Sequence, residues 1–284
     1  MRGHVLITGS TGFIGRSLIP TIIKAGYLVT SISRSSATSD NSCCLDLTNS
    51  RQVSDFINNS EPIDTIIHCA AIAHGEKPPD GYTISEFNSL MVDNLIAAFS
   101  HKQPHWIFLS SIAVYDGDCF DSYIPFDISP RSIDGYGAGK LHDEHSLVNV
   151  CKNLDILRLM PTYDAENMID VEKRIYIPKT GVKLRICPSP AYNFCHVKII
   201  GDTVLSCLES NRGKRLHQIG DPDLVCQHDL LKKVSGVSIV IPQAFFKVIL
   251  MLIPARTQWS LKIRLMLGKL GLPNRFELGV RSLD

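Results

Sequence analysis

The sequence lacks the features that would place it in several common classes of protein. It has no surplus of charge of either sign, since 29 Lys and Arg are balanced by 28 Asp and Glu. A balanced charge gives no general field for nucleic acid, so we expect no nucleic-acid partner. The nine cysteines include no Cys-x-x-Cys pair and no zinc-like spacing. We therefore expect reduced thiols in a cytoplasmic protein and no metal site.

Long apolar runs are also missing. No basic leader with an apolar stretch and a cleavage site opens the chain, so no signal peptide is predicted. The most apolar segment, residues 237–253, is interrupted by Pro242, Gln243 and Lys247. It is a poor candidate for a membrane-spanning helix, and we expect no integral membrane segment.

Acidic residues are absent from residues 230–276, a segment that contains eight lysines and arginines. Charge runs of this kind are usually solvated helix faces, and that is the simpler interpretation here. The alternative is a surface that touches anionic lipid.

Short apolar segments alternate with helical patterns over the first 160 residues. Buried strands are predicted at residues 5–8, 28–32, 64–69, 106–110 and 155–159, and helices at 13–25, 85–100 and 136–151. This alternation predicts an α/β fold, a Rossmann-type doubly wound parallel sheet with helices on both faces. After Pro161 the pattern is irregular, with strand-like pieces at 174–177 and 183–186 and a helical piece at 204–208. We expect a Rossmann domain at 1–160 and a small substrate-binding lobe at 161–284, partly interleaved with the sheet.

A glycine-rich turn joins the first predicted strand to the first predicted helix. Glycines at its three fixed positions permit a tight turn, close approach of a pyrophosphate to the backbone, and close packing of helix on strand. The N–H groups and the dipole of the helix would then hold the phosphates. The turn predicts a nicotinamide dinucleotide bound by Gly9, Thr11, Gly12, Phe13, Ile14 and Gly15.

The residue after the second predicted strand selects between the two nicotinamide cofactors. An acid there would bind the ribose hydroxyls of NAD, but this chain has Arg34, which could pair with the 2′-phosphate of NADP. We favour NADP and keep NAD open, because Arg34 could also be an ordinary loop arginine. Asp46 and Leu47 could reach the adenine. Alternatively, Asp46 caps the helix that starts near Asn49.

A second motif supplies candidate proton-transfer residues. Tyr136 and Lys140 are four positions apart on a predicted helix, so they share one face. The lysine charge would lower the pKa of the phenol from about 10 toward neutrality. The phenol could then accept the proton of an alcohol as the hydride leaves. Ser111, at the end of a predicted strand, could hydrogen-bond the substrate oxygen and orient Tyr136.

Taken in order, these motifs resemble the extended short-chain dehydrogenase/reductases, in the nucleotide-sugar epimerase/dehydratase group. The resemblance covers roughly residues 4–235 and is carried by segments 8–15, 64–71, 110–115, 136–140 and 157–163, with Asn88. It implies that Ser111, rather than Ser110, is the catalytic serine, together with Tyr136 and Lys140. It also implies that Ala70, Ala71 and Pro161 line the cofactor, and that the substrate is a nucleotide-linked sugar.

The resemblance further implies a homodimer. Helices 85–100 and 136–151 of two chains would form a four-helix bundle. The first of them has more apolar residues than one buried stripe needs: Phe87, Leu90, Met91, Leu95 and Phe99.

Departures from the family pattern narrow the reaction. Asp116 and Asp164 stand where glycine is usual, and Ile112 and Ala113 stand where dehydratases have an acidic pair. The acid and base for water elimination are therefore missing, which favours a 4-epimerase or a 4-ketoreductase. We rank these two nearly equal. An epimerase of a lipid-linked sugar at the membrane surface and a non-catalytic NADP-binding regulator are the alternatives.

Overall fold

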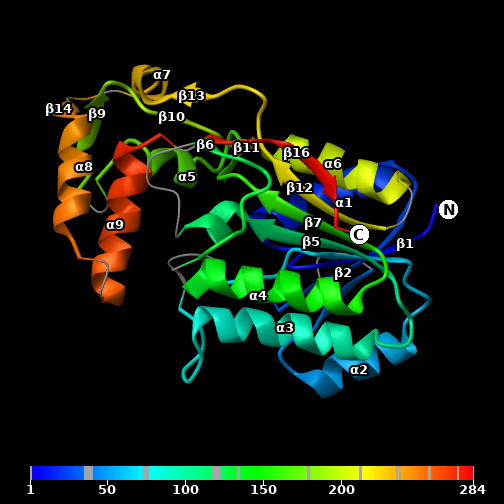
Figure 1. Cartoon of the computed structure of the whole chain (residues 1–284). Coiled ribbons are helices and arrows are strands. Elements are labelled where there is room, and N and C mark those ends of the chain that lie inside the picture. Colours follow the sequence, from blue (N-terminus) through cyan, green and yellow to red (C-terminus); the bar gives the residue numbers. More distant parts are fainter. Residues whose placement is uncertain are drawn as a thin grey trace.

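A twisted eight-stranded sheet forms the centre of the molecule, with helices on both of its faces (Figure 1). This computed structural model describes residues 2–34, 41–72, 77–116, 123–132, 135–177, 180–210, 213–234, 236, 238–254, 257–273 and 275–283. The strands of the sheet are β1 (His4–Thr8), β2 (Leu28–Ser33), β3 (Ser42–Cys44), β4 (Thr65–His68), β5 (His105–Ser111), β7 (Leu154–Leu159), β12 (Lys214–Ile219) and β16 (Gly279–Ser282). They lie in the order β16-β12-β7-β5-β4-β1-β2-β3, and all neighbours are parallel except β12 and β16. The predicted doubly wound α/β fold is confirmed.

Five helices cover the sheet and create two core layers (Figure 1). They are α1 (Phe13–Lys24), α2 (Ser50–Asn59), α3 (Ile84–Ala98), α4 (Gly135–Val150) and α6 (Val197–Glu209). Val5 and Ile7 of β1 point to the layer shared with α1 and α6, while Leu6 points to the layer shared with α2, α3 and α4. Because both faces are covered, the strand is apolar at successive positions instead of alternating.

The predicted elements of the first 160 residues lie within about two residues of the observed ones. One prediction after Pro161 was wrong. Residues 174–177 form no strand beyond an isolated bridge at Tyr176, since Arg174 and Tyr176 continue the hydrogen bonds of the short helix α5 (Ile169–Glu172). The helix expected at 204–208 is confirmed, and it is the end of the longer α6.

The remaining elements are short, apart from two helices near the C-terminus. They are the 3-10 helix η1 (Ile112–Tyr115), β6 (Tyr123–Ile124), β8 (Thr162–Tyr163), β9 (Lys183–Cys187), β10 (Ala191–Tyr192), β11 (Cys195–His196), β13 (Val225–Cys226), α7 (Gln227–Lys232), β14 (Ser238–Pro242), α8 (Gln243–Leu252), α9 (Gln258–Gly271) and β15 (Arg275–Phe276). The main sheet takes β12 and β16 from this second half of the chain. The division into two domains at residue 160 stays a prediction. No helix among the described residues is both long and apolar enough to cross a bilayer.

The apolar residues of α3 have partners inside this chain. Phe87, Met91, Leu95 and Phe99 are all buried in the core layer formed with α2, α4 and the sheet. A second chain is not needed to cover them, so the predicted homodimer now depends on the family resemblance alone.

Candidate active site

The glycine-rich turn brings three backbone segments into direct contact at the carboxyl end of β1. Gly9 has a φ of +68°, a conformation that favours glycine. A Cβ atom at Gly9 would lie 2.6 Å from the Ala70 nitrogen, and one at Gly15 would lie 2.3 Å from the Gly9 oxygen. Larger residues would therefore separate β1, α1 and the segment that follows β4. This is the close backbone packing that the motif predicts.

The N-terminus of α1 has the properties of a phosphate site. Its N-cap, Gly12, offers no side-chain hydrogen bond, and its first turn contains no acid. By contrast, Asn49 and Thr83 cap α2 and α3 with their side chains. The first N–H groups of α1 are thus left for an outside acceptor, and nothing in that turn repels an anion. These residues fit a dinucleotide, with Thr11 and Gly12 exposed beside the half-buried Phe13 and Ile14.

The segment after β4 is fixed next to this turn. The Thr8 hydroxyl accepts a hydrogen bond from the Ala70 N–H at 3.3 Å and contacts His68 Nδ1 at 2.9 Å. Asn88 of α3 exchanges two hydrogen bonds with the backbone of Ile72. Ala70 and Ala71 are both half-buried at this edge. Pro161 follows β7 at the same edge of the sheet, where the carboxyl ends of the parallel strands meet.

The residues predicted to contact the adenine end of the cofactor differ in their surroundings. Arg34 is exposed directly after β2, with its guanidinium carbon 5.8 Å from the centre of the Phe87 ring. Asp46 does not cap α2. Its carboxylate accepts hydrogen bonds from the N–H and hydroxyl of Thr48, while Asn49 is the N-cap. The side chain of Leu47 is buried in the core. Contacts of Arg34, Asp46 and Leu47 with a cofactor stay predictions.

The two serines at the end of β5 point in opposite directions, as successive strand residues do. The Ser110 hydroxyl donates to Glu144 at 2.5 Å and is buried in the core. Ser111 is only half-buried, and its hydroxyl accepts the Ala113 N–H at 3.2 Å as the N-cap of η1. Ser110 is therefore held by the core, while Ser111 lies half-buried at the rim, and its contact with a substrate stays a prediction.

Two glycines set the position of Tyr136 and Lys140. A Cβ atom at Gly137 would lie 2.2 Å from the Ala113 oxygen of η1, and one at Gly139 would lie 2.7 Å from Ser85 Oγ of α3. The start of α4 therefore packs directly between η1 and α3. As a result Tyr136, which is half-buried, lies next to the turn that begins at Ser111.

Lys140 is buried at the carboxyl end of β5. Its ammonium donates to the Leu109 oxygen at 2.9 Å and lies 4.6 Å from the centre of the Phe108 ring. Burial lowers the pKa of Lys140, and the charges of Asp143 and Glu144 act in the opposite direction. Burial and the Lys140 charge lower the pKa of His68 to about 3, so this imidazole is neutral. Burial raises the pKa of Cys69 to about 12, which argues against a thiolate nucleophile.

Buried polar residues on the inner side of α4 were not predicted from the sequence. Glu144 forms an ion pair with Arg158 of β7 at 2.6 Å, and Arg158 also donates to the Tyr115 hydroxyl. Asp143 accepts a hydrogen bond from Ser89 of α3 at 2.5 Å. Burial raises the pKa of Asp143 to about 6, against the opposing effects of Lys140 and Ser89. Asp143 and Glu144 follow Lys140 by three and four residues, so all three share one side of the helix. This spacing was the sequence signal that could have identified them.

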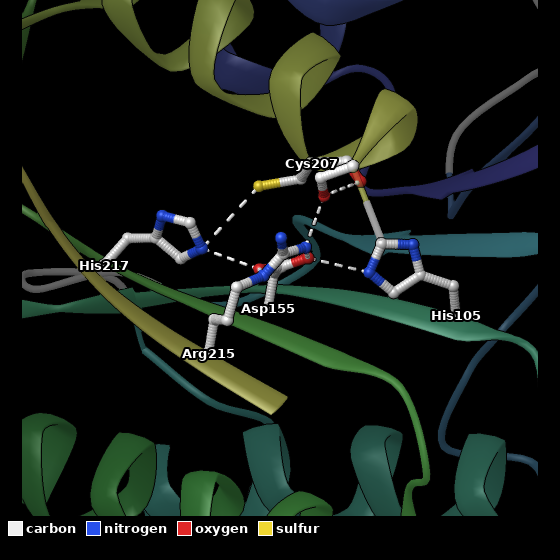
Figure 2. Close-up of polar contacts among 6 residues, drawn as sticks. His105, Asp155, Cys207, Arg215 and His217 are labelled. Carbon is white, nitrogen blue, oxygen red and sulfur yellow. Dashed lines mark hydrogen bonds and ion pairs between the residues drawn. The ribbon is translucent and has the colours of Figure 1, made fainter. Parts of the chain in front are cut away.

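A second polar cluster lies at the opposite end of the strands (Figure 2). The Asp155 carboxylate contacts His105 at 2.8 Å, His217 at 2.6 Å and Arg215 at 2.8 Å, and Cys207 lies 3.8 Å from His217. Asp155, Cys207 and His217 have the residue types and proximity of metal ligands. However, the Arg215 guanidinium already pairs with both carboxylate oxygens. We interpret the cluster as a hydrogen-bonded network that joins β5, β7, β12 and α6.

The two aspartates that replace the usual glycines have local partners. Asp116 is buried, with a carboxylate oxygen 4.0 Å from the ammonium of Lys269 in α9. Asp164 accepts hydrogen bonds from the N–H groups of Glu166 and Asn167 and so closes a turn. Both acids support the C-terminal half of the molecule.

Comparison with known proteins agrees with this geometry. Residues 5–163, more than half of the chain, match the model of the NAD dependent epimerase/dehydratase family. The chain belongs to this family, and the resemblance seen in the sequence is confirmed.

Two curated relatives cover both of the predicted reaction types. The chain is 29% identical over 171 residues to a UDP-glucose 4-epimerase of Vibrio cholerae, covering 57% of this chain and 52% of that protein. It is 28% identical over 168 residues to a probable low-salt glycan biosynthesis reductase of Haloferax volcanii, covering 57% and 54%. The chain thus spans about half the length of the curated relatives it matches.

Solved structures extend the likeness of fold beyond the matched half. A UDP-glucose 4-epimerase from Thermotoga maritima, solved with UDP-glucose, superposes with a TM-score of 0.70 at 15% identity. The match covers 96% of this chain and 89% of that chain. Other structures of this fold were solved with NAD or NADP.

Proposed function

We propose that this protein is a nicotinamide-dependent enzyme that oxidises or reduces a nucleotide-linked sugar at ring carbon 4. The observation that carries the proposal is the joint placement of Ser111, Tyr136 and Lys140. Ser111 ends β5, and Tyr136 and Lys140 lie on α4, at the carboxyl edge of the sheet where the glycine turn offers its open helix N-terminus. A dinucleotide and a proton-transfer group would therefore meet at one edge.

Each of the three side chains has a defined task in this proposal. A dinucleotide held at the glycine turn would supply hydride transfer to or from the sugar carbon. Tyr136 accepts the proton of the sugar hydroxyl at its phenol oxygen, or returns it in the reductive direction. Lys140 is buried, so its charge acts on the phenol at low dielectric and favours the phenolate. The Ser111 hydroxyl hydrogen-bonds the same sugar oxygen and orients it toward Tyr136.

Asp143 and Glu144 support this task from inside the helix. Burial alone favours a neutral Lys140, and a neutral amine would not stabilise a phenolate. The two carboxyl groups act against that effect and favour the ammonium form. The polar contacts behind α4 therefore help to keep Lys140 charged.

The relatives support a nucleotide sugar as the substrate, because one is a UDP-glucose 4-epimerase and the other a reductase of glycan biosynthesis. Epimerisation and reduction differ in stoichiometry. An epimerase recovers its hydride and needs only catalytic cofactor, whereas a reductase consumes one reduced cofactor per product.

The test is to incubate the enzyme with UDP-N-acetylhexosamines and, separately, with a 4-keto nucleotide sugar, while absorbance reports the reduced cofactor. Sugar interconversion without net cofactor change identifies an epimerase. Net oxidation of the cofactor with the keto sugar identifies a reductase. Absence of both reactions, in a protein that binds the cofactor, would contradict the proposal.

For the cofactor we propose NADP in preference to NAD, because a cation, Arg34, follows β2 where an acid would bind the ribose of NAD. The Arg34→Ala variant should weaken NADP binding about tenfold or more and leave NAD binding little changed, since a hydrogen bond to a charged group contributes ~1.5–3 kcal/mol. Titration calorimetry with both cofactors measures this. Equal effects on both would show that Arg34 does not select the cofactor.

A further inference from the structure

The segment formed by β14, α8 and α9 carries about half of the large apolar side chains that the described residues expose. The two helices pack together and project from one side of the molecule, away from the main sheet (Figure 1). Fifteen large apolar side chains are exposed among the described residues, and eight of them lie between residues 239 and 266. These eight are Ile239, Val240, Phe245, Val248, Met251, Leu252, Trp259 and Met266.

The three most exposed of all fifteen meet where the two helices join. Met251 and Leu252 end α8 and are 83% and 75% exposed, and Trp259 near the start of α9 is 74% exposed. We call these three residues the hairpin tip. The other side of α8 is different, since Phe246 and Leu250 are buried against β9 and α9. One side of α8 therefore has a partner within the chain, and the tip has none among the described residues.

The charge around the tip has one sign. No Asp or Glu occurs between Leu230 and Phe276, whereas α8 contains Lys247 and α9 contains Lys262, Arg264 and Lys269. Arg264 donates to the backbone oxygens at the end of α8, and Lys269 lies near Asp116. The segment therefore contributes cations and no acid to this end of the molecule. An anionic surface would therefore meet attraction here and no repulsion.

We propose that the hairpin tip docks this protein on an anionic lipid bilayer. Met251, Leu252 and Trp259 would enter the headgroup region, and the lysines and arginines would pair with lipid phosphates. Tryptophan favours that depth, because its ring is apolar and its N–H can still reach water or headgroups. A projecting tip of three side chains suits a soft bilayer better than a protein, because a standard protein interface needs about 20–30 residues from each partner.

This proposal does not depend on the proposed reaction, because the tip and the Tyr136 site share no residue. The protein has only two tryptophans, and Trp106 is 2% exposed in the core. Emission changes on adding vesicles therefore report Trp259. We expect a blue shift, and quenching by brominated acyl chains, with vesicles of phosphatidylglycerol and phosphatidylcholine at about 3:7. The shift should be at least tenfold weaker with pure phosphatidylcholine and should fall with added salt.

A pair of matched variants tests the tip itself in vesicle co-sedimentation. Met251→Gln with Leu252→Gln should lower binding to anionic vesicles about tenfold. Ile23→Gln with Leu224→Gln, which removes two exposed apolar side chains elsewhere, should bind like the unmodified protein. Equal binding by all three proteins would overturn the proposal. Absence of vesicle binding by the unmodified protein would also overturn it. If the tip variant then turned a dimer into a monomer in sedimentation velocity, the tip would be a contact between two chains instead.

Discussion

The chemistry that we propose for this protein depends on a few side chains. Substitution of Tyr136 tests it most directly. We expect Tyr136→Phe to lower turnover by ~10²- to 10⁴-fold, the usual contribution of a positioned general acid or base. Cofactor binding should stay nearly unchanged, because the phosphates are held at α1. Steady-state kinetics and cofactor titration measure the two effects. A variant that keeps a near-normal rate would show that another group carries the proton.

Asp143 gives a second prediction at the residue scale, through its effect on stability. Its pKa is raised to about 6 in the folded protein, above the unfolded value of about 4. The stability from this group is therefore fully present below pH 4 and is lost as the pH rises through about 6. Asp143→Asn keeps an acceptor for Ser89 and no longer titrates. As the pH rises from 4 to 7.5, the free energy of unfolding of the variant should increase by about 1–2 kcal/mol relative to that of the parent.

Urea unfolding of both proteins at pH 4 and pH 7.5 measures this gain. The variant Asp202→Asn is a suitable control, because Asp202 is exposed on α6, which covers the other face of the sheet. Its difference from the parent should be small and the same at both pH values. If the difference between Asp143→Asn and the parent did not change with pH, the carboxyl group would not be titrating in this window.

At the scale of elements, the strands buried on both faces were the easiest part of the fold to predict. β1, β4 and β5 are apolar at successive positions, and the glycine turn and the Tyr136–Lys140 pair are local patterns. The strand β12 could not be predicted in this way. Its residues Arg215 and His217 are polar because they contact Asp155 of the neighbouring strand. These buried polar residues interrupt the apolar run by which a buried strand is recognised in a sequence.

The C-terminal helices were expected only as solvated helix faces within residues 230–276, and their bounds could not be predicted for a related reason. α8 has apolar residues on every side, so no single helical stripe distinguishes it from a buried strand. Its partner α9 carries Lys262 and Arg264 among apolar residues. The supporting residues Asp143 and Glu144 were missed because acids on a helix are usually solvated. Only the tertiary fold shows that this side of α4 faces the core.

The Asp155 network allows a prediction about how elements are held together (Figure 2). Burial alone would raise the pKa of Asp155, but hydrogen bonds from His105, His217 and Arg215 hold it well below its usual range. A depressed pKa means that the stability from Asp155 is present above the unfolded pKa of about 4 and is lost as the pH falls. Asp155→Asn should therefore cost about 3–5 kcal/mol at pH 7, since it leaves buried partners uncompensated.

The cost should shrink when the same comparison is made at pH 3.5, where the parent has also begun to lose this contribution. Urea unfolding of the parent and the variant at pH 7 and pH 3.5 measures the cost in stability at each pH. Asp229→Asn is the matched control, because Asp229 forms an exposed ion pair with Lys232, which solvent screens, so its loss should change the stability little. A pH-independent cost for Asp155→Asn would mean that its loss acts through packing and not through charge.

At the scale of the whole molecule, the two halves of the chain share one sheet. β12 and β16 extend it beyond β7, and α6 covers it beside α1. The catalytic edge therefore lies between elements from both halves. The Asp155 network begins at His105, the first residue of β5, and Asp155 itself is in register with Ile107, four residues and about 13 Å from Ser111 at ~3.3 Å per strand residue. Stability and chemistry are thus assigned to opposite ends of the same strands.

The last prediction concerns assembly. We propose a homodimer in which α3 and α4 pair with the same helices of a second chain, as the family resemblance implies. Because Phe87, Met91, Leu95 and Phe99 are buried within one chain, the proposed contact uses the half-buried Leu90 and exposed residues such as Ala97. The Ala97→Arg variant adds bulk there, and its charge can pair with Asp93 one turn earlier, so the helix itself should stay stable. Light scattering at micromolar concentration should give a dimer mass for the parent and a monomer mass for the variant.

The exposed apolar tip of α8 and α9 provides the control, since Met251→Gln with Leu252→Gln should leave the dimer intact. A monomer mass for the parent would contradict the proposed assembly, and a dimer that only the tip variant dissociates would move the interface to α8 and α9.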